Sequence, residues 1–196
     1  MHKIVGFGSP IMDRTTNTTI EILHKYGLKT NNQVLGDNKY NDLYKELNGQ
    51  TYDKQIGGAC QNSIRVLQWL LQNTYPNCTN FIGAIGNDDE GRDMQAMMTE
   101  THGVHVDYMV NQSLATGNCY AFVNPEGRSL IANLNAASTY QLHHLMSDSA
   151  SRILEEAHIV YVEGFFLSVS ADTVLYAAKH TAQNNKLFCV SYCNTH

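Results

Sequence analysis

Short apolar runs along this chain alternate with longer segments in which apolar residues recur at helical spacing. The runs have the length of buried strands, and the longer segments predict amphipathic helices that cover them. The predicted strands are residues 3–8, 79–85, 104–110, 158–163 and 186–192. The predicted helices are residues 20–27, 40–49, 60–75, 89–103, 148–156 and 171–183. Strands separated by helices indicate an α/β fold with a mainly parallel sheet and helices on both faces.

Residues 116–134 break this alternation. NCYAFV and RSLIANL flank Asn124-Pro125-Glu126-Gly127, whose residue types favour a tight turn, so we expect a β-hairpin. The hairpin and a short strand at 52–56 fit a parallel sheet poorly. We expect them to form a small accessory sheet, with lid elements drawn from about 14–56 and 116–134, that folds over a ligand crevice.

The last predicted strand ends almost at the C-terminus, with no helix after it to cover the sheet. The 196 residues, 43% of them hydrophobic, suit a single globular domain. We therefore expect residues 1–196 to form one α/β domain that is incomplete on its C-terminal side.

Composition excludes several classes of function. The net charge is −5 and no basic run occurs, which argues against nucleic acid as a partner. No apolar stretch approaches the roughly 20 residues that span a bilayer, and the N-terminus lacks the apolar core of a signal peptide. We expect a cytoplasmic protein with free cysteines. The scattered histidines and five irregularly spaced cysteines predict no metal site.

Gly57-Gly58, between a predicted strand and a predicted helix, is a candidate binding turn. Adjacent glycines permit positive φ and leave no Cβ to obstruct a ligand. The amides that follow belong to a helix N-terminus, which can hold an oxygen-rich ligand such as a sugar or a phosphate. The alternative is a purely structural turn from strand to helix.

Asp13 closes the segment GFGSPIMD, which follows the first strand. The segment starts like a dinucleotide-binding loop, but Ile11 stands where the third glycine is required, so we reject that interpretation. A carboxylate just beyond the carboxyl end of a parallel strand can accept hydrogen bonds from a ribose diol. The alternative is a loop or capping aspartate.

Three further places carry residues that suit a nucleoside. The amide of Asn62 can both donate to and accept from a sugar hydroxyl. Strand alternation places Arg128, Leu130 and Ala132 on one face of the hairpin, where the charge suits a polyol or phosphate and the apolar pair a flat base. Phe165 follows the 158–163 strand and could stack on a base. A solvated arginine and a core aromatic are the alternatives.

Together these segments resemble the adenosine kinase group of the ribokinase-like (PfkB) carbohydrate kinase family, from about residue 3 to residue 190. The resemblance rests on GFGSPIMD, LKTNNQVLGDNKY, GGACQNSIRVLQWLL, FIGAIGNDDEG, GRSLIANLNAA and VEGFFLSVS, in this order. GG-x-x-QNS followed by RSLIANL separates this group from ribokinases and fructokinases. Ser9 is a departure, because the family has asparagine there.

The resemblance implies an adenosine site with specific roles. Asp13 would hold the ribose hydroxyls, with the Gly57-Gly58 turn and Asn62 fixing the sugar. Arg128 would lie on the lid near the reacting 5′ end in a supporting role. The implied substrate-binding residues are Ser9, Asp13, Leu35, Gly57, Gly58, Asn62, Arg128, Leu130, Ala132 and Phe165, of which Leu35, Leu130, Ala132 and Phe165 would surround the purine.

The resemblance also implies what the complete enzyme does. It would transfer the γ-phosphate of ATP to adenosine with Mg²⁺, giving AMP and ADP in purine salvage, as a monomer located in the cytoplasm or also in the nucleus. The family's catalytic aspartate lies in a Gly-Ala-Gly-Asp segment, its magnesium motif is Asn-x-x-Glu, and most of its ATP pocket lies in the C-terminal half. This sequence contains no Gly-x-Gly-Asp, so we expect no catalytic residue here and little or no activity from this chain.

Two alternatives stay open. The chain could be a non-catalytic adenosine-binding or regulatory fragment. It could also belong to another PfkB sugar or nucleoside kinase, such as a ribokinase. Selective binding of the purine nucleoside over free ribose would distinguish an adenosine kinase from that alternative.

Overall fold

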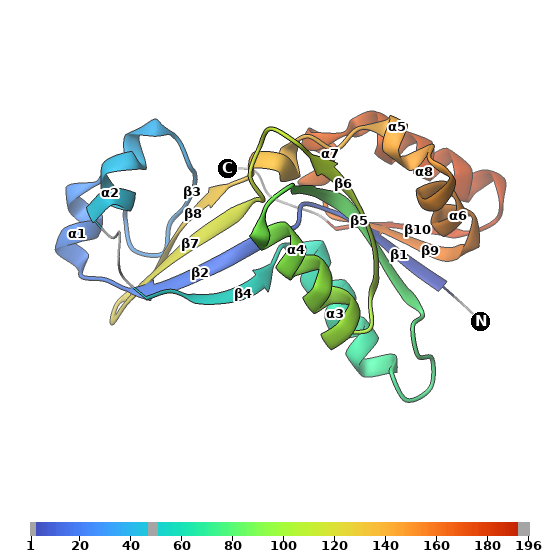
Figure 1. The fold of residues 1–196 in the computed structure, drawn as a ribbon, viewed down its shortest axis with the longest axis horizontal. Coiled ribbons are helices and arrows are strands. Elements are labelled where there is room, and N and C mark those ends of the chain that lie inside the picture. The colour runs from blue at the N-terminus through green and yellow to red at the C-terminus, as the bar shows by residue number, and fades with distance from the viewer. Residues whose placement is uncertain (1–2, 47–50, 192–196) are drawn as a thin grey trace.

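The computed structural model describes residues 3–46 and 51–191 and contains two five-stranded sheets (Figure 1). The sheet that contains β1, called the larger sheet below, has parallel pairing throughout, which confirms the predicted α/β fold class. In spatial order its strands are β10 (Leu187–Val190), β9 (Ala157–Val162), β1 (Lys3–Phe7), β5 (Thr79–Gly86) and β6 (His105–Asn111).

Helices cover both faces of the larger sheet (Figure 1). One face carries α3 (Ala59–Leu71), α4 (Asp89–Ala96) and the π-helical turn η2 (Met97–Thr101). The other face carries α5 (Leu142–Leu145), α6 (Asp148–Glu156), α7 (Phe166–Val169) and α8 (Ala171–Gln183), and the short η3 (Asn135–Ser138) packs against β5. Apolar side chains of the central strands β1, β5 and β9 point alternately into these two layers, whereas Leu187 and Val190 of the edge strand β10 are 62% and 46% exposed.

The second sheet lies to one side of the first and has mixed pairing (Figure 1). Its strands, in spatial order, are β3 (Gln33–Leu35), β8 (Gly127–Asn133), β7 (Asn118–Asn124), β2 (Ile11–Asn17) and β4 (Asp53–Gly57). The β7–β8 pair is the expected antiparallel hairpin with its turn at residues 124–127. The second sheet therefore brings together strands that are distant in sequence, including β2 and β7 in parallel.

One face of the second sheet packs against α1 (Ile20–Lys25), η1 (Asn38–Tyr40) and α2 (Asn41–Glu46). The buried side chains there are Leu23, Leu28, Tyr40, Leu43, Phe122 and Ile131. Thr19 caps α1 by accepting a hydrogen bond from the amide of Ile22. The predicted end of the second helix near residue 49 lies outside the described residues.

The structure differs from the sequence prediction at Asp13, which lies within a strand and not in a loop. IMDRTTN forms β2, whose antiparallel partner is β4. Only Met12 and Thr16 of this strand are buried, so its alternation is carried mostly by polar residues. A half-polar strand that starts directly after Pro10 gives a weak periodic signal, and the sequence reads as a loop.

An ion-pair cluster joins the second sheet to the helix α4. The guanidinium of Arg14 in β2 lies 2.5 Å from Glu90 Oε1 and donates to the hydroxyl of Tyr120 over 2.6 Å. Lys54 Nζ lies 3.1 Å from the same Glu90 oxygen. Because Arg14 and Glu90 are half-buried, this contact helps to fix the angle between the two sheets more than an exposed pair would.

The described residues also bear on the expectations for cysteines, metal sites and membrane spans. Cys60, Cys78, Cys119 and Cys189 are free thiols, and Cys193 lies outside the described part of the chain. No group of three or more His, Cys, Asp or Glu side chains within residues 3–46 and 51–191 is placed to hold a metal ion. Over the same residues, every helix is too short or too polar to cross a membrane.

Candidate functional site

The carboxylate of Asp13 lies directly against Gly57 in the neighbouring strand β4. A Cβ atom added to Gly57 would overlap all three atoms of the Asp13 carboxyl group. In the β2–β4 register Gly57 is opposite Ile11, two residues from Asp13, so the Asp13 side chain leans along its strand toward the glycine. Gly57 therefore provides the space in which the carboxylate sits.

Gly58 has a separate structural requirement. Its φ of +92° is a conformation that residues with a side chain rarely adopt, and it is the N-cap residue of α3. A Cβ atom on Gly58 would lie 2.5 Å from the carbonyl oxygen of Ser9. Both glycines of the turn are thus required by the structure. Gly57 leaves room for the Asp13 carboxylate, and Gly58 adopts a backbone conformation that a side chain disfavours.

Polar atoms at this junction lack protein partners. The Asn62 side-chain oxygen is buried and forms no hydrogen bond in the described part of the chain, whereas the buried Ser9 hydroxyl faces the Glu163 carboxylate. The half-buried Asp13 carboxylate likewise accepts no hydrogen bond from any described residue. Buried polar atoms normally have partners, so the unpaired Asn62 oxygen and the unbonded Asp13 carboxylate indicate a place where a polar ligand can complete the bonding.

Two arginines oppose the effect of burial on Asp13. Burial raises the pKa of Asp13 above its ordinary value, while the positive charges of Arg128 and Arg65 lower it. Arg65 extends from α3, where its guanidinium donates to the carbonyl oxygen of Ile56 over 3.2 Å. The two cations favour an ionised carboxylate that can accept two hydrogen bonds.

A row of side chains crosses the second sheet beside Asp13. The register pairs Asp13 with Cys119, Cys119 with Ala132, and Ala132 with Leu35. Strand alternation puts Leu130 and Arg128 on the same face as Ala132, and the opposite face is the one that packs on α1 and α2. The structure thus places the polar group of Asp13 and an apolar strip of β8 side by side on one open face.

The predicted site residues differ in how far their side chains are buried. Ser9 and Ala132 are buried, whereas Leu35 is 68% and Phe165 is 44% exposed. Phe165 directly precedes α7 and comes two residues after Glu163, which directly follows β9. Leu35 lies at the end of this row, opposite Ala132, whereas the place of Phe165 beside the base stays a prediction.

Sequence reasoning missed three residues at this site. The positive charge of Arg65 lowers the pKa of Asp13. Cys119 lies between Asp13 and Ala132, where burial and the nearby Asp13 charge raise the pKa of its thiol to about 11. Glu163 is 2% exposed and accepts hydrogen bonds from the backbone amides of Ser9 and Cys60. A charged residue at the end of an apolar strand was the one signal in the sequence that could have indicated Glu163.

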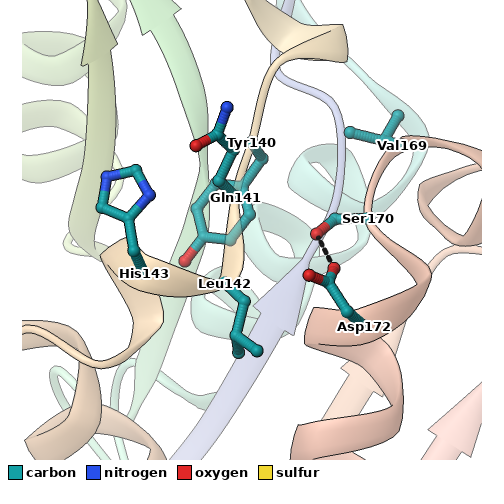
Figure 2. Close-up of a pocket in the computed structure, with 7 residues that line it drawn as sticks. All are labelled: Tyr140, Gln141, Leu142, His143, Val169, Ser170 and Asp172. Carbon is teal, nitrogen blue, oxygen red and sulfur yellow. Dashed lines mark hydrogen bonds between the residues drawn. The ribbon is translucent and has the colours of Figure 1, made fainter.

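A separate hollow of about 340 Å³ lies at the N-terminal end of α8 (Figure 2). It contains none of the predicted site residues and is lined by Tyr140, Gln141, Leu142, His143, Val169, Ser170 and Asp172. The Asp172 carboxylate there already accepts hydrogen bonds from the Ser170 hydroxyl and the Thr173 amide. The buried Tyr140 hydroxyl of this hollow has no hydrogen-bond partner among the described residues. We place the candidate site at the junction of the two sheets because the predicted residues Asp13 and Gly57 meet there.

Comparisons with known proteins agree over nearly the whole chain. The model of the pfkB family of carbohydrate kinases matches residues 23–196. Adenosine kinase 2 of Arabidopsis thaliana is 39% identical over 189 residues, which are 96% of this chain and 54% of that protein. The adenosine kinase of Dictyostelium discoideum is 35% identical over 186 residues, with shares of 95% and 54%. The chain spans about half the length of the curated relatives that it matches.

Solved structures give the same picture. The adenosine kinase of Anopheles gambiae, in complex with P1,P4-di(adenosine-5) tetraphosphate, matches with a TM-score of 0.87 and 36% identity, over 95% of this chain and 55% of that one. The adenosine kinase of Schistosoma mansoni, in complex with adenosine in an occluded loop conformation, matches with a TM-score of 0.87 and 28% identity, over 95% and 54%.

We predict that Gly57→Ala destabilises the fold through Asp13, because the added methyl group needs the space of the carboxylate. The free energy of unfolding should fall by about 2 kcal/mol, as for other overpacked sites. In an Asp13→Ala background the same substitution should cost less than about 1 kcal/mol. Urea unfolding of the wild type, both single variants and the double variant measures this coupling.

Gly27→Ala is the control, since Gly27, unlike Gly57, has a positive φ and has no neighbouring atom within 4 Å of an added Cβ, so its cost comes from the backbone and not from Asp13. Its cost should be the same with and without Asp13. An equal cost of Gly57→Ala in both backgrounds would contradict the placement of Asp13 against Gly57.

Proposed function

This chain belongs to the pfkB family of carbohydrate kinases, and from that premise we propose that it forms the adenosine-binding part of an adenosine kinase. The observation that carries the proposal is the carboxylate of Asp13, which lies against Gly57 and accepts no hydrogen bond from a described residue, together with the unpaired side-chain oxygen of Asn62. The adenosine kinases among its relatives and the structural match to kinases with bound adenosine ligands support the choice of ligand.

The ribose is the part of adenosine that this group of acceptors suits. An ionised carboxylate has two oxygens, so Asp13 can accept one hydrogen bond from each hydroxyl of the ribose diol. The Asn62 oxygen accepts from a hydroxyl as well, and its amide nitrogen can donate. Gly57 and Gly58 let the sugar approach the backbone closely because they present no side chain.

The purine lies, in this proposal, against the apolar strip next to Asp13. Leu130 and Ala132 provide a flat surface on β8, and Leu35 and Phe165 close over the base from β3 and from the segment after β9. The exposure of Leu35 and Phe165 in this chain is consistent with side chains that gain contacts when a base binds. The second sheet then serves as a lid, and Arg128 on β8 lies toward the 5′ end of the nucleoside.

The complete kinase would transfer the γ-phosphate of ATP to the 5′ oxygen of adenosine, giving AMP and ADP, a purine salvage reaction. ATP is the donor that kinases of this family imply. The described residues form no carboxylate cluster that fits Mg²⁺, so no step here is assigned to a metal. Residues 1–196 would contribute the hold on adenosine, and the group that removes the 5′ proton would come from a Gly-x-Gly-Asp segment that this sequence does not contain.

A second candidate function is an adenosine-binding module without catalysis. The same absence of a Gly-x-Gly-Asp segment favours it for a protein that consists of these residues alone. A kinase for a free sugar is disfavoured by the apolar strip of Leu130 and Ala132 beside Asp13, since a sugar without a base would leave that strip uncovered.

We predict that Asp13→Asn weakens adenosine binding by about 10-fold or more, because hydrogen bonds to a charged group contribute about 1.5–3 kcal/mol. Isothermal titration calorimetry measures the dissociation constant. Burial raises the pKa of Asp13, so wild-type affinity should fall as the pH drops through that raised pKa, whereas the affinity of Asp13→Asn should stay flat.

Asp53→Asn is the control for this prediction, because Asp53 is an exposed carboxylate on the adjacent strand β4. Its dissociation constant should equal that of the wild type. Ribose should bind far more weakly than adenosine. Equal affinities of the wild type and Asp13→Asn would rule out the role of Asp13, and equal binding of ribose and adenosine would rule out the purine slot.

We also predict that the 196-residue chain forms no AMP from adenosine, ATP and Mg²⁺ above the level of a reaction without protein. Phosphoryl transfer requires positioned charged groups that the sequence lacks. Chromatographic detection of AMP checks this, with Arabidopsis adenosine kinase 2 as the positive control. AMP formation that rises with the chain's concentration and disappears in Asp13→Ala would contradict the division of roles.

A further inference from the structure

Glu163 is an acidic side chain that the binding proposal does not use, although it is 2% exposed. It directly follows β9, and both of its carboxylate oxygens accept backbone hydrogen bonds. Oε1 accepts from the Ser9 amide over 2.8 Å, and Oε2 accepts from the Cys60 amide over 2.9 Å. The Glu163 amide itself donates to the carbonyl oxygen of Phe7 over 3.1 Å.

These bonds join three segments that are far apart in sequence. Ser9 belongs to the short link between β1 and β2, and Cys60 lies in the first turn of α3. Amides in a first helical turn have no partner inside the helix and usually bond to the N-cap side chain. The N-cap residue of α3 is Gly58, which makes no side-chain bond, so Glu163 supplies the missing acceptor from another strand.

The carboxylate has little freedom to move. A Cβ atom on Gly8 would lie 2.6 Å from Cys60 Cβ and 2.9 Å from Glu163 Cδ, so the glycine allows these groups to pack tightly. Burial raises the pKa of Glu163, while the bonds from the two amides and from the Ser9 side chain favour the ionised form.

We propose that Glu163 is a positioning residue that fixes the link at Ser9 relative to the first turn of α3, and thereby preforms the adenosine site. Ser9 and Gly58 are in contact at this place. Asn62 extends from the same end of α3, and its backbone N–H donates to the Gly58 carbonyl oxygen over 2.9 Å. Without the carboxylate, two buried amides would need new partners, and both belong to segments that carry site residues. The inference rests on the proposed binding of adenosine.

Adenosine titration of Glu163→Gln and Glu163→Ala, together with thermal unfolding, tests the inference. Glutamine keeps the size of the side chain but has one acceptor oxygen, so one of the two amides loses its partner. We expect adenosine affinity to fall roughly 10-fold in Glu163→Gln and further in Glu163→Ala, because buried amides without acceptors displace the segments that carry them. Hydrogen exchange of the Ser9 and Cys60 amides should be slow in the wild type and faster in both variants.

Val160→Ala is the matched control, since Val160 lies in β9, the strand that Glu163 follows, is 0% exposed and belongs to the core away from the site. It should lower the melting temperature while leaving the adenosine dissociation constant within about twofold. A Glu163→Gln variant that binds adenosine like the wild type would overturn the inference, and so would fast exchange of both amides in the wild type. If the wild type bound no adenosine, the proposed function would fail first, which distinguishes the two failures.

Discussion

A buried carboxylate holds together the place where the two sheets meet. Glu163 accepts hydrogen bonds from the link that leads from β1 into β2 and from the helix start that follows β4. Both connections are short, since β1 ends at Phe7 and β2 begins at Ile11, while β4 ends at Gly57 and α3 begins at Ala59. The second sheet therefore cannot shift independently of the larger one at this corner, and Asp13 and Asn62 keep a defined relation.

Polar groups without partners at the same corner lower the stability of the fold and leave a place where a ligand can bind. The carboxylate of Asp13 is half-buried without a hydrogen-bond donor among the described residues, and the buried Asn62 oxygen is also unpaired. Each such group lowers the free energy of unfolding compared with a paired one. Proteins keep local violations of this kind mainly at functional sites. A ribose diol can supply the missing donors, and the adjacent apolar strip of β8 can take the base.

The sequence predicted the larger sheet well and the second sheet only in part. Apolar runs such as residues 79–85 give a strong signal because both faces of a parallel strand are buried. β2 was missed because its alternation is mostly polar, and β3 because three residues carry no period. Asp13 and the glycine turn were proposed as site residues from residue type and order, and the structure places Asp13 against Gly57. Glu163 was not, since it bonds to residues 154 and 103 positions away, a relation that a single sequence does not reveal.

The central claim is that adenosine binds at the junction of the two sheets. Chemical-shift mapping of the ¹⁵N-labelled chain during titration with adenosine tests this claim most directly. The account predicts that the largest amide shifts occur at Ser9, Asp13, Gly58 and Asn62, with little change around the hollow of Figure 2. Shifts concentrated at Gln141, Leu142 and Ser170, or no shifts at saturating adenosine, would contradict it.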